Sequence, residues 1–394
     1  MKSVALYAGI LVLGMGASWM HYTSEEAPAK EGVMLIDANK EELEKVVYKA
    51  PDLEVVFEMR EDAAGRFPWV TVTENKKKKK DGVETVEVKV TRFKAGTAAD
   101  KFIELVAPFM AMRGLDAVDD SKLESFGLKA PDTVVTVTTK GKETKFDLGG
   151  ETYGTKDRYA RDQATGKYYV IDDEVFKPLK FAASRLPERG LTSPKNEEIE
   201  SISLGQGAAL VEWIQKNRED KAATFWERQQ APTAADATAK AGEKDASFSN
   251  WIEKMLKIKS TGYVQEGEEL TEPTILFDLT VKPAGKPAEI VTFLKSGEAY
   301  YAKSNFTRGT VKLSKSSIED VADEVDDVLA GKAPPEKPKP APKPTSPDKM
   351  REMMPGTPPN PNAPSEGGPP RRPPMMPPRP GMPAPPAPPA PSGK

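Results

Sequence analysis

Few side chains in this sequence have the chemistry that catalysis or metal binding most often uses. The chain of 394 residues has one histidine and no cysteine. The histidine, His21, directly follows an apolar N-terminal run, so the rest of the chain has none for an acid–base pair, a triad or a metal site. The lack of cysteine excludes disulfides, thiolate nucleophiles, iron–sulfur clusters and thiolate zinc sites. We therefore expect no catalytic residues, no metal and no cofactor, and a protein that is not an enzyme.

Carboxylates are the abundant group that keeps an enzymatic alternative open. The chain has 60 Asp and Glu residues, and a pair of carboxylates can act as acid and base in hydrolysis. No pair lies in a context that predicts burial. A cleft holding two close carboxylates would favour a carboxylate hydrolase over a binding protein.

Two glycine clusters resemble nucleotide-binding loops only superficially. Gly149-Gly150 and Gly154 precede Thr155-Lys156, but no Gly-Lys-Ser/Thr follows and no helix pattern comes next. Gly205-Gln206-Gly207 lacks the third glycine of a dinucleotide fingerprint and joins two strand-like segments. We interpret both clusters as turns between strands.

A run of five lysines is the clearest charged feature: Lys76, Lys77, Lys78, Lys79 and Lys80. It lies between two alternating segments, Trp69–Thr73 and Val83–Thr91, which predicts that it forms the tip of a hairpin. Such a tip is either a solvated loop or a contact to an anionic surface, such as lipid head groups or the phosphates of an envelope polymer. The net charge of the whole chain is −3, which does not favour a nucleic-acid partner.

Two tyrosine pairs offer a second possible contact. Tyr168-Tyr169 and Tyr300-Tyr301 occupy corresponding late strands of two halves of the chain, and alternation along a strand turns one tyrosine of each pair outward. We select Tyr169 and Tyr301 as possible contacts to a glycan or a protein partner. Sheet surfaces also carry exposed tyrosines without such a role.

The elements that position these residues follow one plan twice. Residues 99–109 and 248–258 are amphipathic helix patterns with the same apolar phase, in which Phe102 corresponds to Trp251. Strand-like segments with hairpin turns precede and follow each helix. We therefore expect an α+β fold of two tandem related modules, residues 49–190 and 195–330, each an antiparallel sheet plus one main helix.

The ends of each element are also predicted by the sequence. The first main helix should run to about Met112, and a short helix at Lys40–Val46 should begin at Asn39. Residues 23–48 should form a tether, and the segment from Pro187 to Pro194 should separate the modules.

The two ends of the chain indicate location. Residues 1–22 form an apolar run with Trp19 and Tyr22 at its acidic side, typical of a transmembrane anchor or of a cleaved signal segment. We expect a single-pass inner-membrane protein with its body in the periplasm, or alternatively a protein secreted to the periplasm after cleavage. Residues 333–394 hold most of the 37 prolines and should be a disordered spacer or a ligand for aromatic grooves.

One segment resembles a known family. Leu123 through Pro131 contains Phe126-Gly127-Leu128 and leads into a hairpin that ends at Gly149-Gly150. This resembles the bacterial envelope family called domain of unknown function 4340, over roughly residues 50–320. The resemblance implies a membrane segment, an extracytoplasmic body, frequent association with gliding-type ABC transporter systems and no known catalytic residues.

These observations predict a membrane-anchored, extracytoplasmic, non-enzymatic accessory or scaffold protein. Its partner should be an ABC transporter component or another envelope machine. The alternative is a cell-wall or polysaccharide-binding module of the envelope.

Overall fold

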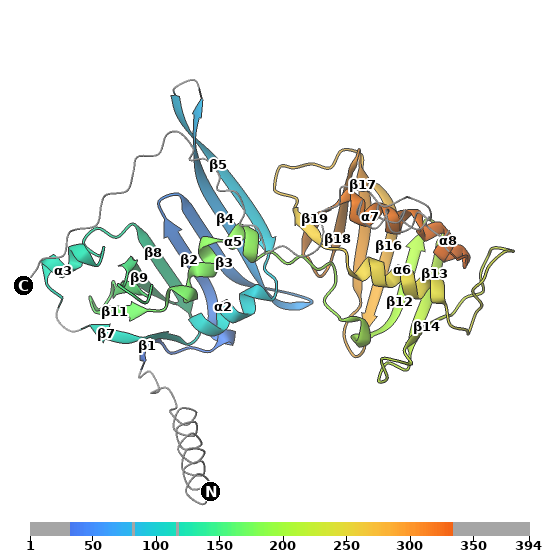
Figure 1. The fold of residues 1–394 in the computed structure, drawn as a ribbon, viewed down its shortest axis with the longest axis horizontal. Helices are drawn as coiled ribbons and strands as arrows, with labels where there is room; N and C mark the ends of the chain where they lie inside the picture. Colours follow the sequence, from blue (N-terminus) through green and yellow to red (C-terminus); the bar gives the residue numbers. More distant parts are fainter. Residues whose placement is uncertain (1–31, 81–82, 116–117, 334–394) are drawn as a thin grey trace, which may run out of the picture. The chain divides into compact units, whose positions relative to one another are not determined.

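The computed structural model describes residues 32–80, 83–115 and 118–333. These residues form two large antiparallel sheets with a few short helices (Figure 1). The α+β class with antiparallel sheets, expected from the sequence, is confirmed. The apolar segment 1–22, the start of the predicted tether and the proline-rich segment from residue 334 onward lie outside the described residues.

The first sheet has nine strands. In spatial order they are β5 (Val83–Lys94), β4 (Gly65–Lys80), β3 (Leu53–Asp62), β2 (Leu43–Ala50), β8 (Thr133–Thr139), β9 (Lys142–Glu151), β10 (Arg158–Asp162), β11 (Tyr168–Ile171) and β7 (Arg113–Leu115). A separate pair, β1 (Val33–Ile36) with β6 (Phe109–Ala111), forms a two-stranded sheet.

The second sheet has eight strands. In spatial order they are β14 (Phe225–Arg228), β13 (Ala209–Lys216), β12 (Ile199–Gln206), β16 (Thr274–Pro283), β17 (Glu289–Ser296), β18 (Ala299–Ser304), β19 (Gly309–Leu313) and β15 (Ser260–Tyr263). Its order repeats that of the first sheet from β4 to β7, strand for strand. Only β5, at the outer edge of the first sheet, has no counterpart.

The helices repeat as well. The first half of the chain contains η1 (Lys40–Glu42), α2 (Ala98–Val106), α3 (Asp120–Ser125), η2 (Asp173–Val175), α4 (Lys177–Lys180) and α5 (Ala182–Arg185). The second half contains η3 (Asn196–Glu198), α6 (Ala246–Leu256), α7 (Lys315–Asp323) and α8 (Val325–Ala330). The main helix α2 follows the hairpin of β4 and β5, and α6 follows β14, the counterpart of β4. In both halves, a pair of short helices follows the last hairpin.

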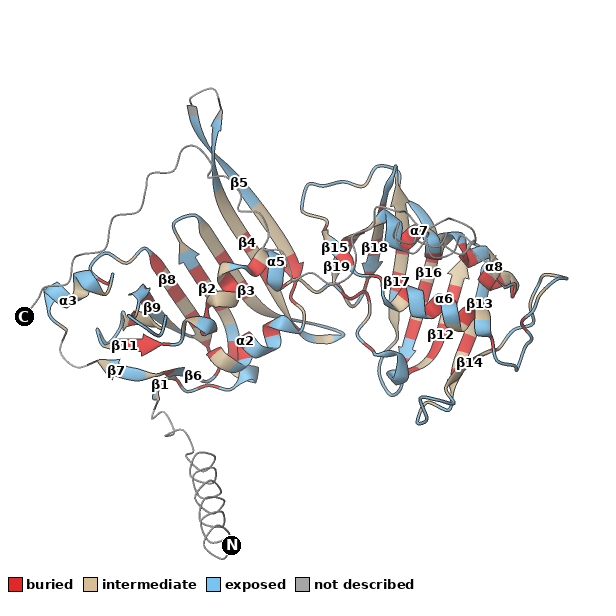
Figure 2. Ribbon diagram, viewed as in Figure 1, coloured by how far each residue is buried: buried red, intermediate tan, exposed pale blue. Residues whose placement is uncertain are grey.

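Each main helix packs its apolar side onto its own sheet, where Figure 2 places the buried residues. In α2, the ring of Phe102 lies edge-on to Phe57 of β3, with ring centroids 5.1 Å apart. In α6, Trp251 lies edge-on to Phe277 of β16 and donates its indole N–H to the carbonyl of Val321, at 2.9 Å. Burial of such aromatic side chains is the main source of stability for sheets of this kind.

Three details of the sequence-based prediction are wrong. The first main helix ends at Val106, because Pro108 cannot continue it, and Phe109 then begins β6. The predicted helix at Lys40–Val46 is only the single turn η1. Residues 33–36 and 43–48 of the predicted tether lie in β1 and β2 of the folded body.

The two sheets are joined by the chain segment that follows α5. The backbone N–H of Glu188 donates to the carbonyl of Lys94 in β5, and the N–H of Ser260 in β15 donates to the carbonyl of Arg189, at 2.9 and 2.8 Å. The linker therefore bonds on one side to the edge strand of the first sheet and on the other side to the edge strand of the second.

Among the residues that the structure describes, none of the helices combines the length and apolar character needed to cross a bilayer.

Candidate functional site

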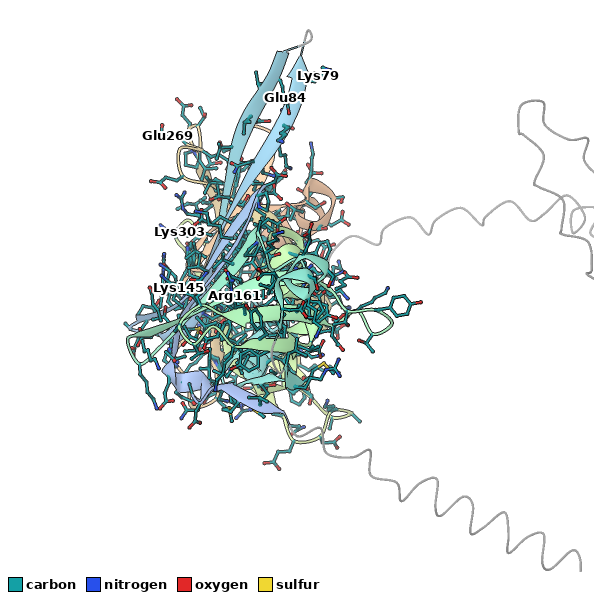
Figure 3. All side chains as sticks on the ribbon, turned by 90° about the vertical axis from the view of Figure 1, so that its left-hand side faces the viewer. Lys79, Glu84, Lys145, Arg161, Glu269 and Lys303 are labelled. Carbon is teal, nitrogen blue, oxygen red and sulfur yellow. The ribbon has the colours of Figure 1, made fainter. Side chains whose placement is uncertain are left out.

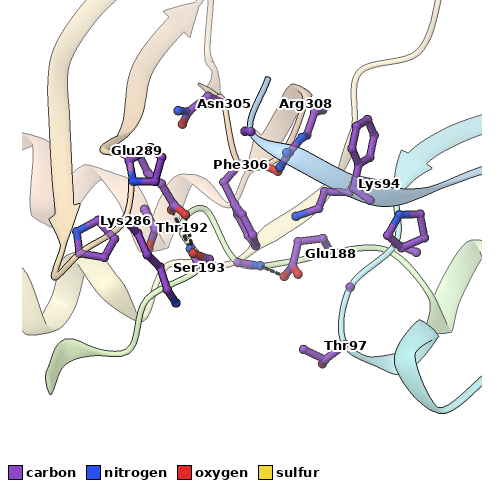
Figure 4. A pocket seen from close by; sticks show the side chains of 18 of the residues that line it. Lys94, Thr97, Glu188, Thr192, Ser193, Lys286, Glu289, Asn305, Phe306 and Arg308 are labelled. Atoms are coloured by element: carbon purple, nitrogen blue, oxygen red, sulfur yellow. Dashed lines mark hydrogen bonds between the residues drawn. The ribbon is translucent and has the colours of Figure 1, made fainter. Parts of the chain in front are cut away.

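A large cavity lies where the two sheets meet. Its volume is about 790 Å³ (Figure 4). The ends of β3 to β5 form one wall, the linker forms the floor, and the turns after β16 and β18 form the other wall. The residues that define its chemistry are Phe67, Lys94, Glu188, Ser193, Glu289 and Phe306.

Lys94 is the most unusual side chain of this cleft. It is the last residue of β5 and only 6% of its surface is exposed. Its ammonium Nζ lies 3.3 Å from the centroid of the Phe306 ring, which belongs to the other wall. A cation over an aromatic face is attracted by the partial negative charge of the π-electron face, so this contact joins the two walls.

Burial lowers the pKa of Lys94 from its ordinary value of 10.5 to about 8. The negative charge of Glu188 opposes this change, and the positive charge of Arg308 adds to it. Near neutral pH, part of the Lys94 population is therefore uncharged. A lysine with a lowered pKa in a cleft is a typical feature of a binding or reactive site.

Two of the three carboxylates that line the cleft, Glu188 and Glu289, are held by the linker. Glu188 accepts a hydrogen bond from the backbone N–H of Gly190 at 2.7 Å, and Glu289 accepts one from the N–H of Ser193 at 2.8 Å. The hydroxyl of Ser193 also donates to Glu289. These bonds fix the shape of the cleft and give both carboxylates a structural partner.

Arg308 closes the side of the cleft next to the first sheet. Its guanidinium forms two hydrogen bonds with the carboxylate of Asp62, at 3.0 and 3.1 Å, and lies 4.5 Å from the ring centroid of Phe67. The pair lowers the pKa of Asp62, mainly through the hydrogen bonds from Arg308. A second ion pair, Arg92 with Glu266 at 2.8 Å, crosses between the sheets further along β5.

The arrangement suits the binding of a polar ligand. An aromatic ring, a lysine of lowered pKa and several hydroxyl groups can together hold a polar organic molecule. Sequence reasoning missed Lys94, because a lysine that ends a strand carries no local pattern that predicts its burial. Only the approach of the turn containing Phe306, more than 200 residues later in the chain, creates its environment.

The lysine run is placed differently from the prediction. Lys76 to Lys80 belong to β4 itself, which continues to Lys80 and pairs with β5 from Trp69 to Lys80. The run therefore forms one strand of a projecting two-stranded arm, residues 74–80 and 83–90, rather than a loop at a hairpin tip. Figure 3 shows Lys79 and Glu84 near the far end of this arm.

The lysines of the arm differ in their partners. Lys76 pairs with Glu74 at 3.2 Å, and Lys78 pairs with Glu87 of β5. Lys77 and Lys79 are exposed and form no ion pair among the described residues. These two lysines are the best placed to contact an anionic surface.

The tyrosine prediction is wrong for one residue. Tyr169 is only 8% exposed and lies in the core of the first sheet, whereas its neighbour Tyr168 is half-buried. Tyr301 is half-buried on the face opposite to the buried Tyr300, as alternation along β18 requires. The two positions selected from the sequence therefore do not share one exposed surface.

Across residues 32–80, 83–115 and 118–333, no group of three or more His, Asp or Glu side chains is placed to hold a metal ion.

The Phe-Gly-Leu segment has a clear structural role at the end of α3. Gly127 takes a left-handed conformation, φ +67°, which ends the helix. The carbonyl of Phe126 then accepts the N–H of Gly150 at 2.8 Å. A Cβ atom at Gly149 would lie 2.2 Å from that carbonyl, so this close approach requires glycine.

Residues 106–276 match the family model described as Domain of unknown function (DUF4340).

The match confirms the resemblance seen in the sequence, over a shorter range than the expected 50–320. The DUF4340 region begins at the end of α2, includes the Phe126-Gly127-Leu128 segment and the whole linker, and ends in β16. It therefore includes parts of both sheets and the segment that joins them. No curated protein and no solved structure matches the chain.

Proposed function

We propose that this protein is a membrane-anchored, non-enzymatic accessory or scaffold protein with its body in the periplasm. Two related α+β modules would form one platform that binds a component of an ABC transporter or another envelope machine. Residues 1–22 would serve as the anchor, or as a signal segment that is removed, and the proline-rich segment 333–394 would act as a disordered spacer.

The observation that supports a platform most directly is the double bonding of the linker. Its backbone bonds to Lys94 of β5 and to Ser260 of β15, and Arg308 and Arg92 add ion pairs across the same junction. A junction with this many polar bonds would hold the two sheets in one arrangement. A partner would then meet the projecting arm and the cleft at fixed positions.

Two carboxylates of the cleft have structural roles, which supports binding over catalysis for these residues. Glu188 and Glu289 each accept a hydrogen bond from a backbone N–H of the linker, which holds both side chains in place. A carboxylate that acts as a general acid needs a raised pKa and access to substrate. Glu188 and Glu289 are instead held by the backbone, whereas the pKa of Asp100, the third carboxylate that lines the cleft, is raised, mainly by burial.

Crosslinking in cells tests this proposal. A photo-reactive amino acid at Lys77, on the arm, should capture a membrane component of a transporter, identified by mass spectrometry. The same amino acid at Tyr153, an exposed residue in the turn between β9 and β10, serves as the matched control and should not. Capture of no transporter component from Lys77, or equal capture from both positions, would contradict the proposal.

A second candidate is a cell-wall or polysaccharide-binding module. The cleft favours it, because Phe306 and the hydroxyls of Thr192 and Ser193 suit a sugar ring and its hydroxyl groups. Peptidoglycan pull-down with Phe306→Ala and Tyr301→Ala variants tests it. Loss of binding only in Phe306→Ala would locate the polymer in the cleft, loss only in Tyr301→Ala would locate it on β18, and no binding by the wild-type protein would exclude this candidate.

A further inference from the structure

The outer strand of the arm has a free edge. In β5, the backbone groups of Arg92 point away from β4: its N–H donates to Oε1 of Gln265 at 2.6 Å, and its carbonyl accepts from Nε2 of the same side chain. Edge-facing groups alternate along an antiparallel strand, so Glu84, Val86, Val88 and Val90 face the same edge. Within the described residues, no hydrogen bond reaches their backbone from that side.

Such an edge can template the addition of another strand, and natural proteins usually block long exposed edges. Here the exposed part of β5 also carries large apolar side chains: Val86 is 58% exposed and Val88 is 60% exposed. Gln265 closes the edge only at Arg92. The open part therefore runs from Glu84 to Val90.

The sequence of this open edge is complementary to itself. An antiparallel copy of β5 centred on Val88 would pair Val86 with Val90, Thr85 with Thr91, Glu87 with Lys89 and Glu84 with Arg92. Every apolar residue then meets an apolar residue, and every charge meets the opposite charge. Cross-strand pairs of these kinds stabilise a sheet, whereas like charges in the same place destabilise it.

The direction of the backbone groups agrees with this register. The two-fold axis would pass through Val88, an edge-facing residue, so Val88 would form a hydrogen-bonded pair with its own copy. Val86 with Val90 would form the flanking pairs, to give roughly six hydrogen bonds in all. Arg92, already bonded to Gln265, lies just beyond the last of these pairs.

Charges further from the edge follow the same order. In β4, Lys76 lies opposite Glu87, and Glu74 lies opposite Lys89. A row across the joined sheets would read Lys76, Glu87, the partner's Lys89 and the partner's Glu74, with signs that alternate throughout. The lysine-rich end of the partner's β4 would approach the acidic segment Gln265–Glu269, which flanks the edge at Arg92.

From these observations we propose that two copies of this chain associate through β5, edge to edge and antiparallel, with the two-fold axis at Val88. The arms then form one continuous sheet between the two bodies. This association is independent of the function proposed above. The ladder is short, so the dimer is weak in solution, with a dissociation constant in the micromolar range.

Disulfide trapping tests the register, because the chain has no cysteine of its own. Hydrogen-bonded antiparallel residues have Cα atoms about 5.5 Å apart, within reach of a disulfide. The full-length Val88→Cys protein, in mild detergent with a gentle oxidant, should form a covalent dimer. Val86→Cys, a control of nearly equal exposure, should not dimerise alone but should crosslink when mixed with Val90→Cys.

Charge reversal in the Val88→Cys background tests the pairing. Glu87→Lys and Lys89→Glu should each slow crosslinking at least tenfold, because each places two like-charged pairs at the interface. A mixture of the two variants, or both changes in one chain, should restore the rate. Equal crosslinking of Val86→Cys and Val88→Cys, or no recovery in the mixture, would overturn the proposal.

Discussion

Arg308, in the turn between β18 and β19, binds Asp62, the last residue of β3, through two parallel hydrogen bonds of 3.0 and 3.1 Å. The two residues are 246 positions apart in the chain and belong to different sheets. Their pairing, with the stacking of Arg308 on Phe67, is the most specific contact between the halves of the body.

Arg308→Ala should weaken this junction without unfolding either sheet. We expect a loss of about 1 kcal/mol, mainly from the stacking on Phe67, since the exposed ion pair itself contributes little. Cleavage of the linker between Pro187 and Pro194 by a protease of broad specificity should become faster. Arg308→Lys, which keeps the charge but not the planar stacking on Phe67, should give an intermediate rate of cleavage. A linker that is equally resistant in the wild type and in both variants would contradict the role of Arg308 in the junction.

The same contact should respond to acid. Because Arg308 lowers the pKa of Asp62 in the folded protein, the pair stabilises the fold at pH values above about 4, the ordinary pKa of aspartate. That contribution is lost as the pH falls through the lowered value. The linker of the Asp62→Asn protein should therefore be cleaved faster than that of the wild type at pH 7. The difference in cleavage rate should shrink toward pH 2.

Lys94 should destabilise the protein at neutral pH. Its folded pKa is about 8 and its ordinary value is 10.5, so the unfolded chain binds this proton more tightly between those values. The penalty is therefore fully present below pH 8 and disappears as the pH rises toward 10.5. Lys94→Met should gain about 1 kcal/mol at pH 7, after allowance for the lost contact with Phe306 and for solvent in the cleft.

Urea unfolding of both proteins at pH 7 and pH 10 measures this effect, and the advantage of Lys94→Met should be smaller at pH 10. Reductive methylation with a ¹³C label gives the pKa of Lys94 directly by NMR. A value above 10 would show that the cleft does not desolvate this amine.

Arg228 should be essential to the second sheet. It is fully buried, donates to the carbonyls of Gln230 and Val328 at 3.0 Å each, and lies 3.7 Å from Asp245. Arg228→Met would leave the Asp245 carboxylate and the end of α8 without these bonds. We expect a loss of about 3 kcal/mol, measured by urea unfolding. Lys303→Met, which replaces an exposed lysine of β18 in the same sheet, should change stability by less than about 0.5 kcal/mol.

The arm should bind anionic membranes through two of its lysines. Lys77→Gln with Lys79→Gln should reduce binding to vesicles containing phosphatidylglycerol by roughly tenfold or more, since each lysine near such a surface contributes about 1 kcal/mol. Lys76→Gln with Lys78→Gln is the matched control and should have a smaller effect, because Glu74 and Glu87 already pair with these lysines. Equal effects of the two double changes would exclude this role for Lys77 and Lys79.

Strands with regular alternation were predicted well from the sequence. β8 has the expected ends, because Thr133–Thr139 alternates strictly between buried and half-buried residues. β2 was mistaken for a helix, because the register shifts between Leu43 and Lys45. Because of this irregularity, Leu43 and Val46 are both buried although they are three residues apart. Buried residues at this spacing are typical of a helix.

Long-range features were not predictable in this way. β15 has the sequence Ser-Thr-Gly-Tyr and exists because β19 and the linker bond to it. The burial of Lys94 depends on Phe306, and the location of the cleft depends on how the two sheets meet. The self-complementary pattern of β5, in contrast, is visible in the sequence of residues 83–93. Only the structure shows that this strand lies at a free edge, where a second copy could pair with it.

The distance between the two sheets tests the central claim, a platform with one fixed arrangement, most directly. One spin label can be attached at Lys145→Cys in β9 and one at Lys303→Cys in β18, both exposed positions. No other site is labelled, because the chain has no cysteine of its own. Pulsed electron paramagnetic resonance on magnetically diluted protein should give one narrow distance distribution, and Arg308→Ala should broaden it. A broad or multiple distribution in the otherwise unchanged protein would contradict the account.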